Sequence, residues 1–325
     1  MLLSVNNIAA RRPLLDRTDG HWPFYDRGLY DALGRSVQGD GRWTCRRTPP
    51  AGSGLQWGMA DILELHRGTA PLLVSLPHDG TRLPDDIAQR LTPEARAVPD
   101  TDWHVSRLYA FARALGASVL VPRYSRYVID LNRPEDDASL YPGQNTTGLC
   151  PRVRFDGGPV YLDGAAPDAA EIAARVDRYW RPYHAALRDE LDRLRARHRR
   201  VVLWEGHSIR GTLPFLFEGR LPDLNLGTAG GTSCTLALEA RISTLLADQA
   251  DYGWVANGRF RGGHITRHYA APEDGIEAVQ LEISQRCYMD EAGFDWDPAR
   301  AEALQPLLRR LLETAIAHAR GSRTG

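Results

Sequence analysis

The 325-residue chain contains no lysine, only four cysteines and almost no net charge. Its 40 residues of the Lys and Arg types are all arginine, and 41 acidic residues bring the formal net charge to −1. Because the arginines are spread along the chain instead of forming a basic patch, we expect neither nucleic acid nor a membrane surface as a partner. Arginine is also well suited to bidentate recognition of carboxylates.

The few cysteines lie far apart, and no pair has the CxxC spacing. This spacing argues against a zinc ribbon, a CxxC redox motif and a disulfide framework, so we expect a reducing, cytoplasmic compartment. We expect no signal peptide, because the arginines near the beginning follow a short apolar run instead of preceding it. No segment approaches the length and apolarity needed to cross a bilayer. The four cysteines are Cys45, Cys150, Cys234 and Cys287.

The usual phosphate-binding motifs and internal repeats are also missing. No GxGxxG follows an expected strand, and no GxxxxGK[ST] occurs. Residues 1–58 mix arginine, glycine, proline and aromatic residues without sustained periodicity, so we expect an N-terminal arm or lid there. Residues 59–325 are expected to form a single α/β domain, because strand and helix patterns alternate along them.

That alternation predicts a mixed, mostly parallel sheet with helices on both faces. Strands are expected at 62–66, 71–77, 118–122, 127–131, from 201 onward, and at 253–260 and 278–284. Helices are expected at 102–115 with Thr101 as N-cap, at 172–194 with a kink or a new start at Pro182, at 235–248 and at 302–320. The stretch from 135 to 167 is rich in glycine and proline, and its length indicates a functional or covering loop.

Ionisable residues stand where two of the apolar strands end. The strand from 201 ends on Glu205 and His207, and the strand at 71–77 ends on His78 and Asp79. Ligands of open α/β sheets bind beyond the carboxyl ends of strands. Two histidines with one carboxylate would form an open zinc site that keeps a position for water. The carboxylate could be Asp79, Asp102 or Glu205, and we favour Asp102 because it begins an expected helix; the alternative is a pair of ordinary buried histidines.

Glu282 lies in the strand at 278–284, on the face opposite Val279, Leu281 and Ile283. A carboxylate buried or half-buried in a strand needs a partner or a task. Beside a metal-bound water it would act as a general base that passes the proton to a leaving nitrogen. The alternative is a salt bridge to an arginine.

Several arginines follow or flank the same strand ends, where they would suit an anionic substrate through bidentate contacts. Only those that share one cleft would count, and the sequence does not choose among them. They are Arg126, Arg133, Arg210, Arg259, Arg261 and Arg267. Gly262 and Gly263, before His264, would let the backbone approach a ligand, although a simple turn explains them equally well.

Five segments resemble the N-formylglutamate amidohydrolase (N-formylglutamate deformylase) family: PLLVSLPHDGTRLP, TDWHVSRLY, YVIDLNRP, LWEGHSIRGTLPFLFEGRLPDLNLGT and RFRGGHITRHYAAPEDGIEAVQLEISQRCYM. They span about residues 63–291. The resemblance implies a three-layer zinc carboxypeptidase-like α/β fold. It also implies hydrolysis of N-formyl-L-glutamate to formate and glutamate at the end of a histidine-degradation route.

A fainter similarity to zinc carboxypeptidases and aspartoacylase-like enzymes implies individual roles. By this similarity His78 and His207 are metal ligands, Asn132 and Arg133 hold a substrate carboxylate, and Glu282 is the base. The third ligand stays open, because Thr81 stands where carboxypeptidases carry glutamate; Asp102 remains our hypothesis.

Two smaller departures from the family pattern concern Glu205 and His264. Glu205 stands where relatives are expected to carry aspartate, and we expect it to accept a hydrogen bond that orients His207. His264 stands where relatives tend to have tyrosine, which could alter substrate preference.

Together these observations predict a zinc-dependent amidohydrolase that removes a small acyl group from an acidic amino acid. Glu282 would be base and then acid, and Arg126 or the zinc would stabilise the oxyanion. Arg133 and Arg267 would hold two carboxylates, with Arg210 also in the substrate site. The first alternative is a carboxypeptidase or deacylase acting on another N-acyl acidic amino acid or a short peptide, and the second is a non-catalytic protein that binds an acidic metabolite. The oligomeric state does not follow from the sequence.

Overall fold

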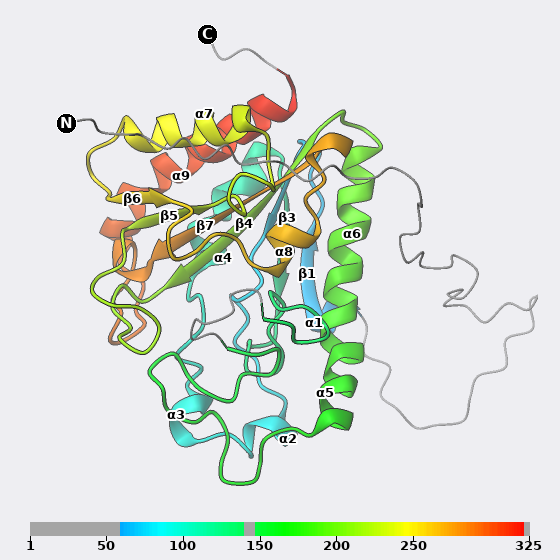
Figure 1. Ribbon diagram of the computed structural model, residues 1–325, viewed down its shortest axis with the longest axis vertical. Coiled ribbons are helices and arrows are strands. Elements are labelled where there is room, and N and C mark those ends of the chain that lie inside the picture. The colour runs from blue at the N-terminus through cyan, green and yellow to red at the C-terminus, as the bar shows by residue number, and fades with distance from the viewer. Residues whose placement is uncertain (1–58, 140–146, 322–325) are drawn as a thin grey trace, which may run out of the picture. The chain divides into compact units, whose positions relative to one another are not determined.

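The computed structural model describes residues 59–139 and 147–321 (Figure 1). Within these ranges seven strands form one sheet in the order β1-β3-β2-β4-β7-β5-β6. The strands are β1 (Leu63–His66), β2 (Leu72–Ser75), β3 (Ser118–Pro122), β4 (Val201–Ile209), β5 (Leu224–Gly227), β6 (Trp254–Ala256) and β7 (Ile276–Ser284). The pairs β1–β3 and β5–β7 are antiparallel and the other four are parallel, which confirms the predicted mixed, mostly parallel sheet.

Helices cover both faces of the sheet, as the alternation predicts (Figure 1). Helices α7 and α9 pack against each other on one face, and α6 packs against β2, β3 and β4 on the other. The α-helices in the described ranges are α1 (Met59–Ile62), α2 (Asp85–Ala88), α3 (Pro93–Arg96), α4 (Val105–Leu108), α5 (Ala169–Arg175), α6 (Arg181–Arg195), α7 (Leu236–Ala247), α8 (His264–His268) and α9 (Pro298–Ala319). A π-helical turn, η2 (Val176–Trp180), joins α5 to α6, which begins at Arg181 with Pro182 in its first turn.

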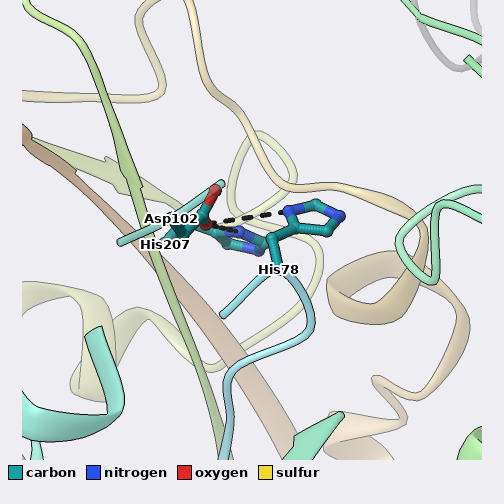
Figure 2. A group of neighbouring side chains, drawn as sticks. All are labelled: His78, Asp102 and His207. Atoms are coloured by element: carbon teal, nitrogen blue, oxygen red, sulfur yellow. Dashed lines mark hydrogen bonds and ion pairs between the residues drawn. The ribbon is translucent and has the colours of Figure 1, made fainter. Parts of the chain in front are cut away.

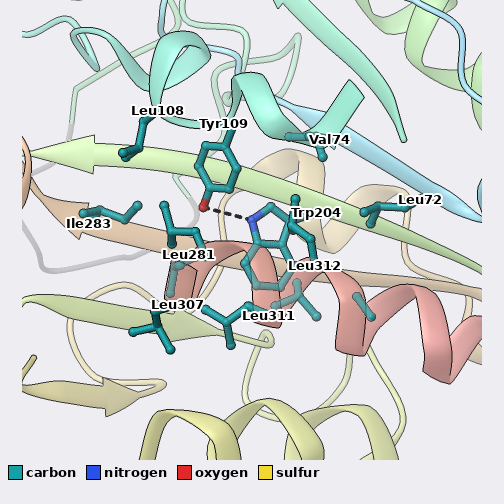
Figure 3. Packing of buried hydrophobic residues seen from close by; sticks show 14 of the residues in the cluster. Leu72, Val74, Leu108, Tyr109, Trp204, Leu281, Ile283, Leu307, Leu311 and Leu312 are labelled. Carbon is teal, nitrogen blue, oxygen red and sulfur yellow. Dashed lines mark hydrogen bonds between the residues drawn. The ribbon is translucent and has the colours of Figure 1, made fainter. Parts of the chain in front are cut away.

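The central strand β4 is buried along its whole length, as expected for a parallel strand covered on both faces. Trp204 points into the core on the α9 side, where its indole N–H donates to the hydroxyl of Tyr109 at 3.1 Å (Figure 3). Gly206 follows on the same side, and a Cβ there would lie 2.6 Å from Leu76 Cδ2. Glycine therefore separates Glu205 from His207, because the core leaves no room for a side chain between them.

The prediction of one helix over 102–115 is wrong, because the helical structure begins later and is not continuous. The chain turns at Asp102 and enters the short helix α4 only after His104, whose φ is 63°. The His104 imidazole lies 2.8 Å from the carbonyl oxygen of Phe294 through Nε2, a contact that holds this left-handed residue in place. Helix α4 is followed by a separate 3₁₀ helix, η1 (Ala110–Leu115).

The strand expected at 127–131 is also wrong, because these apolar residues are buried in turns without ladder partners. The carbonyls of Tyr127 and Val128 accept hydrogen bonds from the guanidinium of Arg175 instead. Strand β5 was missed, and β6 is shorter than the expected strand at 253–260. Two short 3₁₀ turns, η3 (Pro272–Asp274) and η4 (Gln285–Cys287), flank β7.

The predicted arm over 1–58 lies outside the described residues. No described helix is both long and apolar enough to span a membrane. Cys150, Cys234 and Cys287 are buried free thiols, whereas Cys45 lies outside the described ranges.

Candidate active site

Two histidines and one aspartate meet at the carboxyl ends of the adjacent parallel strands β2 and β4 (Figure 2). His78 follows β2, His207 lies near the end of β4, and Asp102 comes from the turn before α4. Asp102 Oδ2 is 3.0 Å from His207 Nδ1 and 3.7 Å from His78 Nδ1. All three side chains are buried, and their candidate ligand atoms lie within 4.8 Å of one another, so this group could hold a metal ion.

Asp79, Asp102 and Glu205, the three carboxylates considered from the sequence as third metal ligand, occupy different places in the structure. Asp102 lies in the cluster, whereas Asp79 accepts a hydrogen bond from the backbone N–H of Ser106. Glu205 lies on the far side of His207, where its Oε1 is 2.9 Å from Nε2. This is the contact that the orienting role expected for Glu205 requires.

His78 has a matching outer partner that the sequence analysis missed. Its Nε2 is 2.7 Å from Asp130 Oδ1, so each histidine faces a carboxylate through Nε2 and Asp102 through Nδ1. A carboxylate on one nitrogen fixes a proton there and turns the other lone pair toward a metal. The signal for Asp130 was a lone carboxylate in the apolar run Tyr127–Leu131, because such a buried charge needs a partner.

The electrostatics of the cluster favour a bound cation. Burial opposes a charge on His207, but the negative charge of Glu205 and hydrogen bonds to Asp102 and Glu205 raise its pKa well above the usual range. Burial would raise the pKa of Asp102, but His78 and His207 hold that pKa below its ordinary value. Two imidazoles and a carboxylate are ligands typical of zinc and related divalent metals, so the residues present fit such an ion.

Arg126 lies beside the cluster with its guanidinium fixed and buried. Its Nη2 is 2.8 Å from Asp130 Oδ2, and its Nη1 is 3.7 Å from Asp102 Oδ1. Burial alone would lower the pKa of Arg126, but the charges of these two aspartates raise it. The group therefore stays positively charged where it reaches the pocket.

Glu282 is the neighbour of His207 across the parallel pair β4–β7. Its side chain is only 6% exposed, it lines the pocket, and its carboxylate forms no hydrogen bond or ion pair with any described residue. The predicted alternative, a salt bridge to an arginine, is therefore not found within the described part of the chain. Burial raises the pKa of Glu282 to about 8, although the nearby His207 counteracts the shift.

The pocket in front of the cluster carries three arginines and few other charges. Its lining comprises His78, Asp102, Arg126, Asn132, Arg133, Thr147, Phe155, His207, Ser208, Ile209, Leu216, Arg259, Phe260, Gly263, Gln280 and Glu282. The Arg133 guanidinium is held by the carbonyl of Thr147 at 2.7 Å. Such a lining suits a small substrate with more than one carboxylate.

Three residues expected in the substrate site do not line this pocket in the described structure. Arg210 instead points its Nη2 toward Asp100 Oδ1 at 3.7 Å. Arg267 is exposed and donates to the carbonyl of Gly262. His264 stacks on His268, with ring centroids 4.9 Å apart. Arg259 lines the pocket, although the sequence did not distinguish it from the other candidate arginines.

The segment Leu131–Arg133 is held against the π-helical turn η2 and α6. The indole N–H of Trp180 donates to the carbonyl of Arg133 at 2.9 Å. The ring of His184 stacks on that of Trp180, with ring centroids 3.7 Å apart. Its Nε2 lies 2.9 Å from the carbonyl oxygen of Leu131, and its Nδ1 lies 2.9 Å from the hydroxyl of Tyr269. A neutral His184 satisfies both contacts, because one nitrogen donates and the other accepts.

We expect His184 to make stability depend on pH. Burial, aided by the charge of His264, lowers the pKa of His184 to about 3. Below pH 6.5, the ordinary pKa, His184 is protonated in the unfolded chain but stays neutral in the folded chain. The contribution of His184 to the free energy of unfolding is therefore complete above pH 6.5 and is lost as the pH falls toward 3. The slope is about 1.4 kcal/mol per pH unit for one such proton.

Urea unfolding of the wild type and His184→Asn at pH 7, 6 and 5 measures this slope. The wild type should lose stability more steeply than the variant. Equal slopes in both proteins would show that His184 titrates normally in the folded state.

A mixed α/β sheet with paired histidines, carboxylates behind them, a glutamate without a partner among the described residues and a pocket lined by arginines is typical of a hydrolytic enzyme. Residues 70–289 match the family model described as N-formylglutamate amidohydrolase, and the chain belongs to this family.

Relatives of known name extend the match over most of the chain. It is 51% identical over 263 residues to the N-formylglutamate deformylase of Pseudomonas aeruginosa, a match that covers 81% of this chain and 98% of that protein. It is 50% identical over 260 residues to the N-formylglutamate deformylase of Pseudomonas putida, covering 80% and 97%. The crystal structure of N-formylglutamate amidohydrolase from Ralstonia eutropha JMP134 superposes with a TM-score of 0.69 at 24% identity, over 80% of this chain and 99% of that one, and this likeness concerns the fold.

Proposed function

We propose that the chain hydrolyses N-formyl-L-glutamate to formate and L-glutamate with one divalent metal ion, for which zinc is the expected choice. The observation that carries the proposal is the cluster of His78, Asp102 and His207 beside Glu282, whose carboxylate has no partner among the described residues, in a pocket lined by arginines. The deformylase names of relatives about half identical over nearly their whole length support the substrate.

The metal would be held by Nδ1 of His78, Nδ1 of His207 and a carboxylate oxygen of Asp102. When bound, such an ion polarises an acyl oxygen and acidifies a coordinated water. With the metal bound, Asp130 and Glu205 would accept the Nε2 protons of the two imidazoles, because each lies within hydrogen-bond distance of an Nε2 atom.

Glu282 would take a proton from the attacking water and return it to the substrate nitrogen as the bond from the formyl carbon to that nitrogen breaks. A base must be ionised, and burial alone works against this in the pocket. The positive charge of a nearby cation stabilises the carboxylate form. Its place beside His207 across the β4–β7 pair brings Glu282 close to that charge.

The arginines would divide the negative charges of the substrate among them. Arg126, held by Asp130 and Asp102, would stabilise the formyl oxygen as it becomes an oxyanion. Arg133 and Arg259 would hold the two carboxylates, since both line the pocket. Arg259 takes the place in this proposal that Arg267 had in the sequence-based prediction.

Release of a free amino acid, which every substrate in the comparison yields on hydrolysis, tests the substrate against the alternatives. The purified protein is given N-formyl-, N-acetyl- and N-succinyl-L-glutamate and a short peptide. We expect the highest kcat/KM for the formyl substrate, with a loss of about 10- to 200-fold for the added methyl of the acetyl group. A preference for the peptide or the larger acyl groups would favour a carboxypeptidase or another deacylase. Glutamate binding without turnover of any substrate would instead favour the non-catalytic alternative.

We place the reaction in a reducing cytoplasm and at the end of histidine degradation. The free thiols of Cys150, Cys234 and Cys287 agree with a reducing compartment.

A further inference from the structure

Gln280 is a pocket residue to which the proposed mechanism gives no task. It lies on β7 two residues before Glu282, so both side chains leave the strand on the same side. Its neighbour across the β4–β7 pair is Glu205. The side chain is only 4% exposed, and the surface that remains accessible lines the pocket.

The orientation of the Gln280 amide is fixed by the one side-chain hydrogen bond that it makes with a described residue. The backbone N–H of Gly263 donates to Gln280 Oε1 at 2.7 Å. A backbone N–H can only donate, so the atom that faces it must be the amide oxygen and not the nitrogen. The Nε2 group, with two N–H donors, therefore points the other way.

These two donors have no acceptor among the described residues. The side-chain nitrogens of two other amides near the site do have partners: Gln285 Nε2 donates to the carbonyl of Thr101, and Asn132 Nδ2 lies 3.1 Å from His207 Nε2. The Nε2 atom keeps some accessible surface, so its donors can bind water or a ligand in the pocket. The Nε2 group of Gln280 is therefore an oriented hydrogen-bond donor for a ligand in the pocket.

We propose that Gln280 is a specificity-determining residue that donates a hydrogen bond from Nε2 to a carboxylate oxygen of the substrate. The inference rests on the proposed function, and it adds a neutral donor to the guanidinium groups of Arg133 and Arg259 in the same lining. The two carboxylates of a formylated acidic amino acid offer more acceptor positions than two guanidinium groups use.

The test compares Gln280→Glu and Gln280→Met in the full-length, metal-loaded protein. Glutamate keeps an oxygen for Gly263 but replaces the donors with negative charge, whereas methionine removes both functions at similar size. Three substrates are used: N-formylglutamate, N-formylglutamine and the α-amide of N-formylglutamate. Binding of L-glutamate, L-glutamine and the α-amide of L-glutamate is measured by calorimetry in parallel.

For Gln280→Met we expect a 10- to 100-fold higher KM for N-formylglutamate at a nearly unchanged kcat, because a hydrogen bond to a charged group is lost (about 1.5–3 kcal/mol). For Gln280→Glu we expect one of the two amides to become the preferred substrate, because its NH₂ group can donate to the new carboxylate. The amide that gains identifies the carboxylate that Gln280 contacts.

Equal losses on all three substrates, or no change on any, would overturn the inference. The matched control is Gln305→Glu, which adds the same charge on α9, where Gln305 donates to the carbonyl of Leu108. This control should leave the ranking of substrates unchanged. If the wild type releases no formate, the proposed function fails, and the calorimetric comparison of L-glutamate with its two amides still decides the role of Gln280.

Discussion

Replacing Glu282 with glutamine should lower kcat about 10²- to 10⁴-fold, the usual contribution of a general base. The amide has nearly the shape of the carboxylate but cannot accept the proton of the attacking water. Glu282 makes no hydrogen bond or ion pair with any described residue, so the change should leave the surrounding contacts intact. Single-turnover kinetics and metal content by elemental analysis measure the two expected outcomes, a slow chemical step and a full complement of metal.

A matched control lies on the same strand. Glu277 is also buried in β7, but its carboxylate is fully engaged with Thr235 and with His318 at 2.7 Å. Glu277→Gln should lower stability through these lost contacts and leave kcat of the folded protein near that of the wild type. Wild-type turnover in Glu282→Gln would remove Glu282 from the mechanism.

Replacing Asp102 with asparagine should weaken metal binding more than any change behind the histidines. Asp102 is the carboxylate whose oxygen faces Nδ1 of both His78 and His207, so the change removes the negative charge from the cluster itself. Loss of an outer partner costs about 10- to 100-fold in metal affinity, and we expect Asp102→Asn to exceed about 100-fold. Competition with a chelator of known affinity measures both values.

Asp130→Asn is the comparison for this prediction, because Asp130 contacts His78 only through Nε2. Its metal affinity should fall between those of the wild type and Asp102→Asn. The reverse order would show that Asp102 orients the histidines instead of binding the metal.

The sheet and the position of the cluster could be predicted from the sequence because both follow from local patterns. Apolar runs that end on His78 and His207 mark strand ends, and parallel neighbours bring such ends together. The placement of Asp102 beside them also agrees with the prediction. The reason given for it was wrong, since Asp102 lies in a turn before a left-handed His104 and not at the start of a helix.

The rest of the site depends on long-range contacts that leave no periodic signal. Tyr127–Leu131 resembles a strand in composition, yet the carbonyls of Tyr127 and Val128 accept hydrogen bonds from Arg175, which lies far along the chain. The lone carboxylate of Asp130 in this run indicates a buried charge, but its partners, His78 and Arg126, follow only from the structure. Among many similar arginines, only tertiary packing distinguishes Arg259 in the pocket from Arg267 outside it.

The most direct measurement is formate release from N-formyl-L-glutamate by the purified protein, first after chelation and then with Zn²⁺, Co²⁺ or Mn²⁺ restored. We expect activity to disappear with the metal and to return with at least one of these ions, while Asp102→Asn recovers little at the same metal concentration. Full activity in the chelated protein, with no metal left by elemental analysis, would contradict a metal-dependent deformylase built on His78, Asp102 and His207.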